Sequence, residues 1–155
     1  MDTEIKMNAK MSTFLTDKCK KITRKFYNKG SYNAFKNRVE KSIAPDYYDV
    51  IKEPMYLSEV LRKLKNNLYS ELSQYVHDMN LIWSNAIIYN GENSYFGILA
   101  QCCEYKFKKE LEKLSTTKQD EHLYKLKKYS EQISFWAQYL QKELDHVPTK
   151  YDGKV

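Results

Sequence analysis

The histidines and cysteines are the residues whose spacing most readily reveals chemistry, and here it predicts neither a metal site nor a catalytic site. His77, His122 and His146 lie far apart, and none belongs to an HxxxH or HExxH motif. Cys102 and Cys103 fall inside a helical pattern, where a thiol usually acts as a small apolar side chain. A catalytic cysteine needs a partner base and an activated thiolate, and the sequence identifies neither. We therefore expect no metal, no cofactor and no enzymatic activity.

The bulk composition describes one helical domain with an additional element. The chain has 155 residues with only 4 glycines and 3 prolines, which favours long helices with few breaks. Three cysteines without a CxxC pair suit a reducing compartment. The N-terminal MDTEIKMNAK lacks the apolar run of a secretory signal, and no stretch approaches the ~20 apolar residues that span a bilayer. We expect a cytoplasmic or nuclear protein without a membrane contact.

The net charge of +6 allows two interpretations. The basic residues are spread along the chain between apolar residues at helical spacing, which is typical of a solvated helix surface. The alternative is a patch that contacts nucleic acid, because a basic surface attracts the phosphate backbone. A weak DNA contact therefore stays open.

Apolar residues recur at steps of three and four in five segments, which predicts five helices. These segments are residues 8–29, 58–66, 70–90, 94–114 and 119–144. We expect Gly30 to end the first helix in a left-handed conformation. Ser58 and Ser94 are expected to cap the second and fourth helices. The predicted buried stripe of the fourth helix includes Ile98 and Cys102.

Residues 31–57 interrupt the helical pattern, because Pro45 and Pro54 both oppose helix in their surroundings. Connections longer than ~15 residues are uncommon unless they are functional. This one is also rich in apolar side chains such as Val39, Ile43 and Met55. A loop this apolar must pack against the protein or line a cavity.

Two motifs in and after this loop closely resemble the bromodomain family. The run APDYYDVIKEPMYL at residues 44–57 resembles the family signature, written loosely as PDYYxxIKxPMDL. The run LIWSNAIIYN at residues 81–90 resembles the end of the family's helix B, where a Tyr-Asn pair closes the helix. Ser94 and Phe96 follow at the family's spacing. The resemblance covers residues 11–114, and two motifs at the correct spacing make it specific.

The resemblance implies an all-α fold, a left-handed bundle of four helices named Z, A, B and C with a long ZA loop. We expect residues 8–114 to form the bromodomain and residues 118–146 to form an additional C-terminal helix, with flexible tails at residues 1–7 and 147–155. The additional helix is expected either to pack against the bundle or extend its last helix, or to present its apolar stripe to a partner. A monomer is expected.

The function implied by the resemblance is binding of N-acetyl-lysine in histone tails or other nuclear proteins. By resemblance, Asn90 would donate its side-chain amide to the acetyl carbonyl, and Tyr47 would reach the same oxygen through an ordered water. The other residues implied to line or support the pocket are Val39, Phe35, Tyr48, Ile51, Tyr89 and Phe96. Phe96 would lie at the rim and narrow it. The protein would act in the nucleus.

Physical chemistry is consistent with these roles, although the residues around Asn90 alone leave a second interpretation open. Acetylation removes the lysine charge and leaves an amide and a methyl group. An apolar cavity rejects the unmodified ammonium, because burying an unpaired cation is costly. Taken locally, however, Asn90 beside Gly91 is better explained as a simple helix C-cap, and only the upstream loop motif reverses this preference.

The sequence departs from the family at the aromatic shelf that begins the ZA loop. Where the family often has Trp-Pro-Phe, this chain has Asn33, Ala34 and Phe35. The family's aspartate in PMDL is Tyr56, and Ser58 is expected to take over the cap. A second function therefore stays open: an interaction or DNA-binding scaffold of bromodomain fold with weak or lost acetyl-lysine binding.

Overall fold

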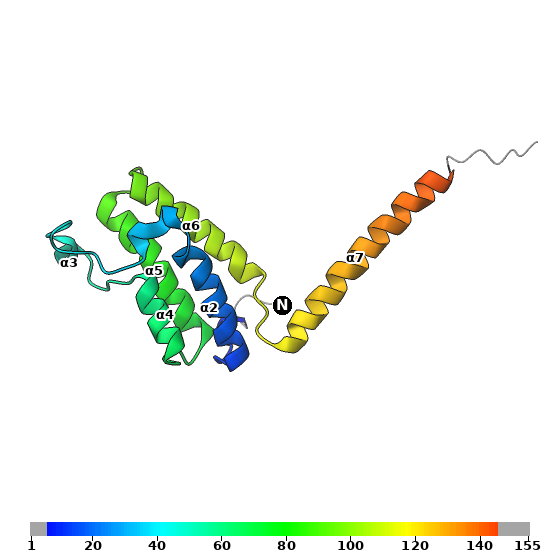
Figure 1. The fold of residues 1–155 in the computed structure, drawn as a ribbon, viewed down its shortest axis with the longest axis horizontal. Helices are drawn as coiled ribbons and strands as arrows, with labels where there is room; N and C mark the ends of the chain where they lie inside the picture. The colour runs from blue at the N-terminus through cyan, green and yellow to red at the C-terminus, as the bar shows by residue number, and fades with distance from the viewer. Residues whose placement is uncertain (1–5, 146–155) are drawn as a thin grey trace, which may run out of the picture. The chain divides into compact units, whose positions relative to one another are not determined.

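The computed structural model describes residues 6–145, which form two compact units that divide at Thr116 and Thr117. The first unit contains a helical bundle and the second a single long helix (Figure 1). No helix among the described residues combines the length and apolar character needed to cross a membrane.

Four helices form the bundle, and the described residues contain no β-strand, so the expected all-α four-helix fold is confirmed. The four are α2 (Thr13–Tyr27), α4 (Leu57–Lys65), α5 (Leu72–Asn90) and α6 (Tyr95–Glu112). Figure 1 shows them side by side, with α5 packed along α6 and α2 along α4. A backbone bridge between Lys10 and Glu71 joins the segment before α2 to the start of α5.

The bundle core follows from the helical spacing of apolar residues along α2. Leu15, Cys19, Ile22 and Phe26 are all buried, as the periodicity predicts. At the bundle centre the ring of Phe26 lies 5.6 Å from that of Trp83, which is fully buried. Large aromatic side chains of this kind contribute much of the apolar area that a small core can bury.

The predicted end of the first helix is wrong. α2 stops at Tyr27 with Asn28 as its C-cap, and Gly30 begins a short 3-10 helix, η1 (Gly30–Phe35). Gly30 has no positive φ, so the left-handed conformation expected of it is not used. The chain turns immediately into a second helical element whose Tyr32 and Phe35 are buried, and this tertiary packing outweighs the local stop signal.

Of the two predicted serine caps, one is confirmed and one is wrong. The Ser94 hydroxyl oxygen accepts a hydrogen bond from the Gly97 amide at 2.9 Å and caps α6. Ser58 lies inside α4, whose N-cap Tyr56 makes no side-chain cap bond. The Ser58 amide instead donates to the Lys36 carbonyl at 2.9 Å, so the chain near Lys36 satisfies this helix terminus.

The face of α6 that packs against the bundle also differs from the prediction. Ile98 is 53% exposed and Cys102 is exposed, whereas Ala100 and Cys103 are buried. Small residues on this face allow α6 to lie close to α5, and Gly97 belongs to the same face. A prediction that ranks residues by hydrophobicity favours Ile98 and overlooks the small residues Gly97, Ala100 and Cys103.

The second unit is one 28-residue helix, α7 (Lys118–Asp145). Its bounds lie within one residue of the predicted ones. None of its residues is buried. His146 and the predicted tails, apart from Lys6 and Met7, lie outside the described residues, and Met7 packs against the bundle core.

Candidate functional site

The apolar loop between η1 and α4 builds a small core of its own. Ala44, Tyr47 and Ile51 are buried together, and Val39 is among the half-buried residues that pack against them. The loop contains one helical turn, α3 (Tyr47–Val50), which lies at the outer end of the loop in Figure 1. The prediction that this loop must pack on something is therefore confirmed.

Side-chain hydrogen bonds attach the loop to α5 at two points. Near its C-terminal end, the buried Asn85 side chain donates to the Glu53 carbonyl at 2.8 Å. In its middle, the Tyr89 hydroxyl donates to the Asp46 carboxylate at 2.7 Å. Because Asn85 and Tyr89 are four residues apart on α5, one helix face holds the loop at two points.

A cavity of about 550 Å³ lies between this loop and the adjoining ends of α5 and α6. Its size falls within the range of small-ligand pockets. The lining residues are Asn33, Ala34, Phe35, Asn37, Arg38, Val39, Glu40, Ile43, Ala44, Tyr47, Met55, Tyr56, Ile82, Ala86, Tyr89, Asn90 and Phe96. Most of them are apolar or aromatic, so a polar ligand group would find few hydrogen-bond partners there. Asn90 is one of these few partners.

Asn90 is the last residue of α5, and its side-chain Nδ2 donates to the Ala86 carbonyl at 2.9 Å. This bond holds the carboxamide against its own helix. An asparagine NH2 group carries two hydrogens, and this bond uses one of them. Gly91 follows at φ 86°, a conformation that favours glycine, and the chain turns away from α5 there.

The turn from α5 to α6 is held by a close backbone contact. A Cβ atom at Gly97 would lie 2.0 Å from the Gly91 carbonyl oxygen, so only glycine fits at this position. The Ser94 hydroxyl donates to the same Gly91 oxygen at 2.8 Å. These contacts fix the start of α6, and therefore Phe96, relative to Asn90.

Tyr47 is 7% exposed, and its ring lies 5.0 Å from that of Tyr89. Burial raises the pKa of Tyr47 above its ordinary value, with smaller contributions from Tyr48 and Tyr89. The Tyr47 phenol therefore stays protonated and can both donate and accept a hydrogen bond.

The structure brings most of the predicted site residues together around this cavity. The predicted residues that line it are Asn33, Ala34, Phe35, Val39, Tyr47, Tyr89, Asn90 and Phe96. Tyr48 and Ile51 are not among the lining residues. The Tyr48 hydroxyl donates to the Val39 carbonyl at 2.6 Å, and Ile51 is buried beneath Tyr47, so both support the loop.

Sequence reasoning missed several lining residues that have a recognisable signal. Ile82 and Ala86 precede Asn90 by eight and four residues, so the three share one helix face. Arg38 and Glu40 gave no comparable signal, because their place depends on the path of the loop. The Arg38 side chain donates from Nε to the Tyr48 hydroxyl at 3.0 Å and stacks on the Tyr48 ring.

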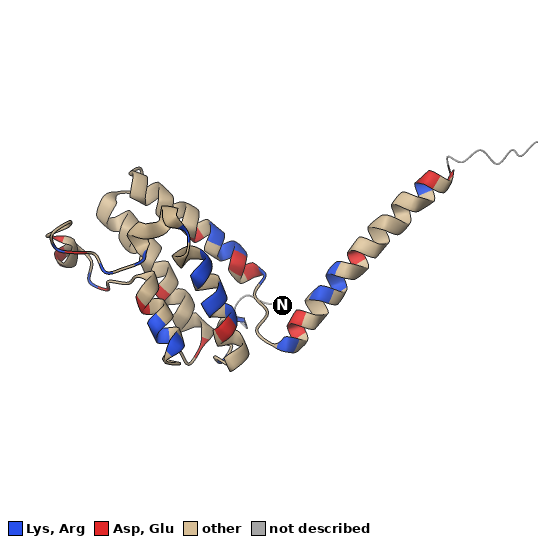
Figure 2. Cartoon of the chain, viewed as in Figure 1, with Lys and Arg blue, Asp and Glu red and all other residues tan. Residues whose placement is uncertain are grey.

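Formal charge is nearly absent from the helical side of the cavity. Residues 79–103, which include the second half of α5 and the first half of α6, contain a single charged residue, Glu92. In Figure 2 the ribbon of the second half of α5 and of the first half of α6 is tan, whereas blue and red segments mark charged residues on α2, α4 and the end of α6. The helical wall is therefore neutral.

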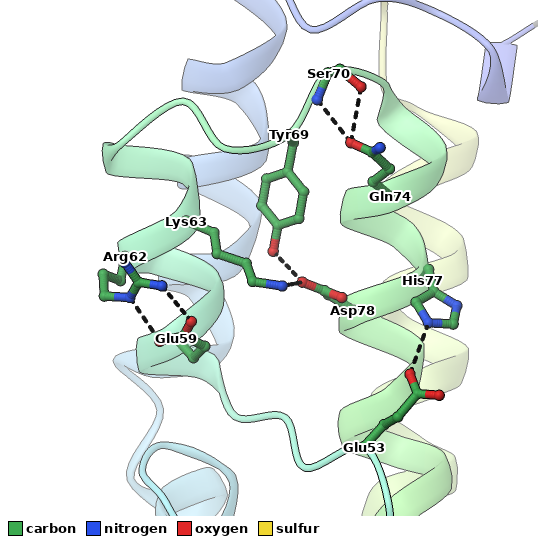
Figure 3. Close-up of polar contacts among 9 residues, drawn as sticks. All are labelled: Glu53, Glu59, Arg62, Lys63, Tyr69, Ser70, Gln74, His77 and Asp78. Atoms are coloured by element: carbon green, nitrogen blue, oxygen red, sulfur yellow. Dashed lines mark hydrogen bonds and ion pairs between the residues drawn. The ribbon is translucent and has the colours of Figure 1, made fainter.

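A second, more open depression lies between α4 and α5, and its polar groups bond to one another. Lys63 Nζ and the Tyr69 hydroxyl both donate to the buried Asp78 carboxylate, at 2.6 and 2.7 Å (Figure 3). Burial, followed by the bond to Asp78, raises the pKa of Tyr69. A buried carboxylate needs such partners, so this cluster serves the structure of the bundle.

The cysteines and histidines of the described residues form no site. Burial raises the pKa of Cys19 to about 12 and that of Cys103 to about 11, which suppresses the reactive thiolate. Between residues 6 and 145, no group of three or more His, Cys, Asp or Glu side chains is placed to hold a metal ion.

A four-helix bundle with an apolar end pocket, closed by a long loop and bordered by an asparagine, defines a ligand-binding module of the bromodomain type. The model of the bromodomain family matches residues 19–101, more than half of the chain. The chain belongs to the bromodomain family. Bromodomains are reader modules for acetyl-lysine rather than enzymes.

Individual proteins agree with this assignment. The SAGA complex subunit Spt7 of Schizosaccharomyces pombe is 56% identical over 57 residues, which is 37% of this chain and 6% of that protein. The nucleosome-remodeling factor subunit NURF301 of Drosophila melanogaster is 42% identical over 73 residues, 47% of this chain and 3% of that protein. The chain thus spans a small fraction of these relatives.

Among solved structures, the second bromodomain of Candida albicans Bdf1, bound to an imidazopyridine, is similar to this chain. The TM-score is 0.61 with 25% identity, and the match covers 64% of this chain and 99% of that one. The shared region is therefore a whole bromodomain.

Proposed function

We propose that the cavity binds an N-acetyl-lysine side chain, with the acetyl carbonyl accepting a hydrogen bond from Asn90. The observation that carries this proposal is the position of Asn90, a carboxamide at the border of an otherwise largely apolar cavity of about 550 Å³. The Nδ2 hydrogen that does not bond to Ala86 is the donor we assign to the ligand. The bond to Ala86 keeps the group oriented before a ligand arrives.

Discrimination against unmodified lysine is proposed to come from the neutrality of the helical wall, where Asn90 lies, because the charged lining residues Arg38 and Glu40 belong to the loop wall. An ammonium group entering the cavity would lose water without gaining an ion pair from α5 or α6, which is costly. Acetylation replaces the ammonium with an amide and a methyl group. The methyl group would lie against Ile82 and Ala86, and the amide carbonyl would lie near Asn90.

Tyr47 is proposed to act on the same carbonyl through a bridging water. Its phenol is buried in the loop core and held by the ring of Tyr89. A hydroxyl kept protonated in this way can donate to a water that in turn donates to the ligand oxygen. Direct and water-mediated donors together would fix the orientation of the acetyl group.

Binding should be modest in strength. The buried ligand head has few heavy atoms, and the best tiny ligands gain at most about 1.5 kcal/mol per atom. We expect a micromolar dissociation constant, corresponding to about 5–8 kcal/mol, for one acetylated peptide. Neighbouring peptide side chains would then contribute to selectivity at the rim, where Asn33 and Ala34 replace an aromatic shelf.

The biological setting that we propose is chromatin in the nucleus, with acetylated histone or another acetylated nuclear protein as the partner. This rests on the relatives named above, which are subunits of the SAGA complex and of a nucleosome-remodeling factor. Because the chain spans a small part of those proteins, their assemblies are not assigned to it.

An acetylated histone peptide array followed by calorimetry tests the proposal. Acetylated peptides should bind, unmodified ones should not, and Asn90→Ala should weaken binding by at least about tenfold, as expected for a lost ligand hydrogen bond in an apolar site. Asn93→Ala is the matched control, because Asn93 is exposed in the same turn and does not line the cavity. Unchanged binding by Asn90→Ala would refute the assignment.

The array also tests the alternative function, a scaffold that has lost acetyl-lysine binding. That alternative predicts silence toward every acetylated peptide, together with duplex DNA binding that weakens steeply with salt. A silent array obtained with folded protein would contradict the acetyl-lysine assignment. DNA binding alone would not contradict it.

A further inference from the structure

α7 presents a long apolar face that its own unit does not cover. The helix has 28 residues, about 42 Å at 1.5 Å per residue, and none of them is buried. The large apolar side chains exposed on it are Leu123, Leu126, Ile133, Phe135, Trp136, Leu140 and Leu144, together with Tyr124, Tyr129 and Tyr139. Most helices in proteins owe their stability to packing of an apolar face, so α7 needs a partner.

The spacing of this face is that of a coiled coil. Steps of three and four residues alternate along one line of the helix, and their average is 3.5. The residues on this line are Leu123, Leu126, Ser130, Ile133, Ala137, Leu140 and Leu144. We call this line the α7 seam. It extends over three heptads. Lys128 and Phe135 lie on the opposite side of the helix.

The charges of α7 are divided between its two halves. Residues 118–130 contain four lysines and two acidic residues, a net charge of +2. Residues 131–145 contain one lysine and three acidic residues, a net charge of −2. Two such helices attract each other when they run in opposite directions and repel when they run in the same direction.

We propose that α7 pairs with α7 of a second copy of this chain as an antiparallel coiled coil. Full overlap of the two helices places Leu123 opposite Leu140 of the second copy. In the same register Leu126 faces Ala137, and Ser130 faces Ile133. Each small seam residue thus meets a large one, which keeps the packing volume even along the contact.

The residues beside the seam fit the same register. Tyr129 and Trp136 both flank the seam on the same side of the helix. In the antiparallel arrangement Tyr129 of one copy lies beside Trp136 of the other, so two aromatic pairs cover the seam. At the ends, the same register brings the basic start of one helix to the level of the acidic end of the other, with Lys118 and Asp145 lying outside the seam.

A membrane surface is a poorer occupant for this face. Helices that lie on membranes usually carry lysine and arginine along their whole polar face, because the membrane surface is anionic. The second half of α7 is acidic and would be repelled by such a surface. The division of charge therefore favours a helix of the same sequence.

Sedimentation equilibrium of the full chain over a micromolar concentration series tests the proposal. The chain should dimerise reversibly, and Ile133→Glu should weaken the dimer by more than about tenfold, because it buries a charge in the seam. Phe135→Glu is the matched control: Phe135 is 63% exposed and Ile133 69%, but Phe135 lies opposite the seam. Thermal unfolding of the bundle should be the same in both variants.

Disulfide trapping tests the orientation. Leu123→Cys and Leu140→Cys are prepared separately in a Cys102→Ser background, since Cys102 is the exposed native cysteine, and one variant carries a short tag that changes its mass. The antiparallel arrangement predicts disulfide dimers between the two variants when they are mixed and oxidised. A parallel pair would instead link each variant to itself.

Three results would overturn the proposal. A chain that stays monomeric throughout the concentration series would do so, as would a dimer that Ile133→Glu and Phe135→Glu weaken equally. Self-linked cysteine variants without the mixed species would refute the antiparallel direction. A mixed disulfide together with selective loss in Ile133→Glu would support it.

Discussion

The two walls of the pocket are built by different means. One wall is the end of α5 and the start of α6, where Gly91 and Gly97 bring two backbones into close contact. The other wall is a loop that folds on its own small core and is attached to α5 by the side chains of Asn85 and Tyr89. In the proposed complex, the helical wall would set the position of the hydrogen bond to the ligand, whereas the loop wall would set how much of the ligand is covered.

The largest expected effect comes from disturbing the helical wall. In Gly97→Ala the new methyl group would meet the Gly91 carbonyl oxygen, so the turn after Asn90 must shift. We expect the free energy of unfolding to fall by about 1–3 kcal/mol, as for overpacked sites, and peptide binding to be largely lost. Denaturant unfolding and calorimetry measure the two effects.

Gly30→Ala is the matched control for this substitution. A Cβ atom at Gly30 meets nothing within 4 Å, and the backbone there has no positive φ. Its effect should stay within about 0.5 kcal/mol. Equal destabilisation by the two substitutions would show that the close approach at Gly97 does not hold the turn.

A smaller effect is expected from the loop wall. Asn85→Ala removes the bond from the buried Asn85 side chain to the carbonyl of the exposed Glu53, which should cost about 0.5–1.5 kcal/mol of stability. Peptide binding should weaken several-fold without disappearing, because Asn90 keeps its place. Asn80→Ala, at an exposed position on α5, controls for the change of residue type.

Hydrogen exchange sharpens this test. Amides of the loop around Glu53 should exchange faster in Asn85→Ala, whereas those of α6 should not change. Equally faster exchange in the loop and in α6 would show that the loop wall and the helical wall open together, which would contradict the comparison.

The smallest expected effect is that of pH on ligand binding. The ordinary tyrosine pKa is near 10, and burial raises that of Tyr47, while the hydrogen bond to Asp46 raises that of Tyr89. Both phenols therefore remain protonated up to a pH above 10, and the Asn90 amide does not titrate. Affinity for an acetylated peptide should stay level across about pH 6–9, measured by calorimetry.

Stability should respond to alkaline pH with a definite sign. A tyrosine whose folded pKa lies above its unfolded value contributes fully below pH 10, and its contribution is lost as pH rises through the folded pKa. Unfolding followed from pH 8 upward should therefore show stability declining from about pH 9, where the thiols of Cys19 and Cys103 ionise in the unfolded chain, and more steeply beyond about pH 10, where the unfolded tyrosines ionise. For ligand binding, a change in affinity for the acetylated peptide between about pH 6 and 8 would contradict the expected level profile, because Tyr47, Tyr89 and Asn90 keep their protonation state there.

Much of the fold and site could be predicted from local patterns. The α2 stripe, the apolar loop and the position of Asn90 at a helix end follow from spacing and from motifs of adjacent residues, because each depends on neighbours in the chain. The four-residue spacing also predicts that Ile82 and Ala86 share the helix face of Asn90.

Other features depended on contacts between distant segments. Whether Ser58 or the chain near Lys36 satisfies the start of α4 depends on where the loop returns. The buried face of α6 is chosen by close approach to α5, which favours Ala100 and Cys103 over the more apolar Ile98. Such choices are set by backbone distances that no local pattern encodes.

The sequence by itself determined the class of fold and the residues of both motifs, and through its resemblance to the family it predicted Asn90 as the residue that holds an acetyl group. Only the tertiary structure decided which residues line the pocket and which, like Tyr48 and Ile51, support it from behind. The physical reason is that helix periodicity is a property of neighbouring residues, whereas a pocket is the space left between segments that pack from far apart in the chain.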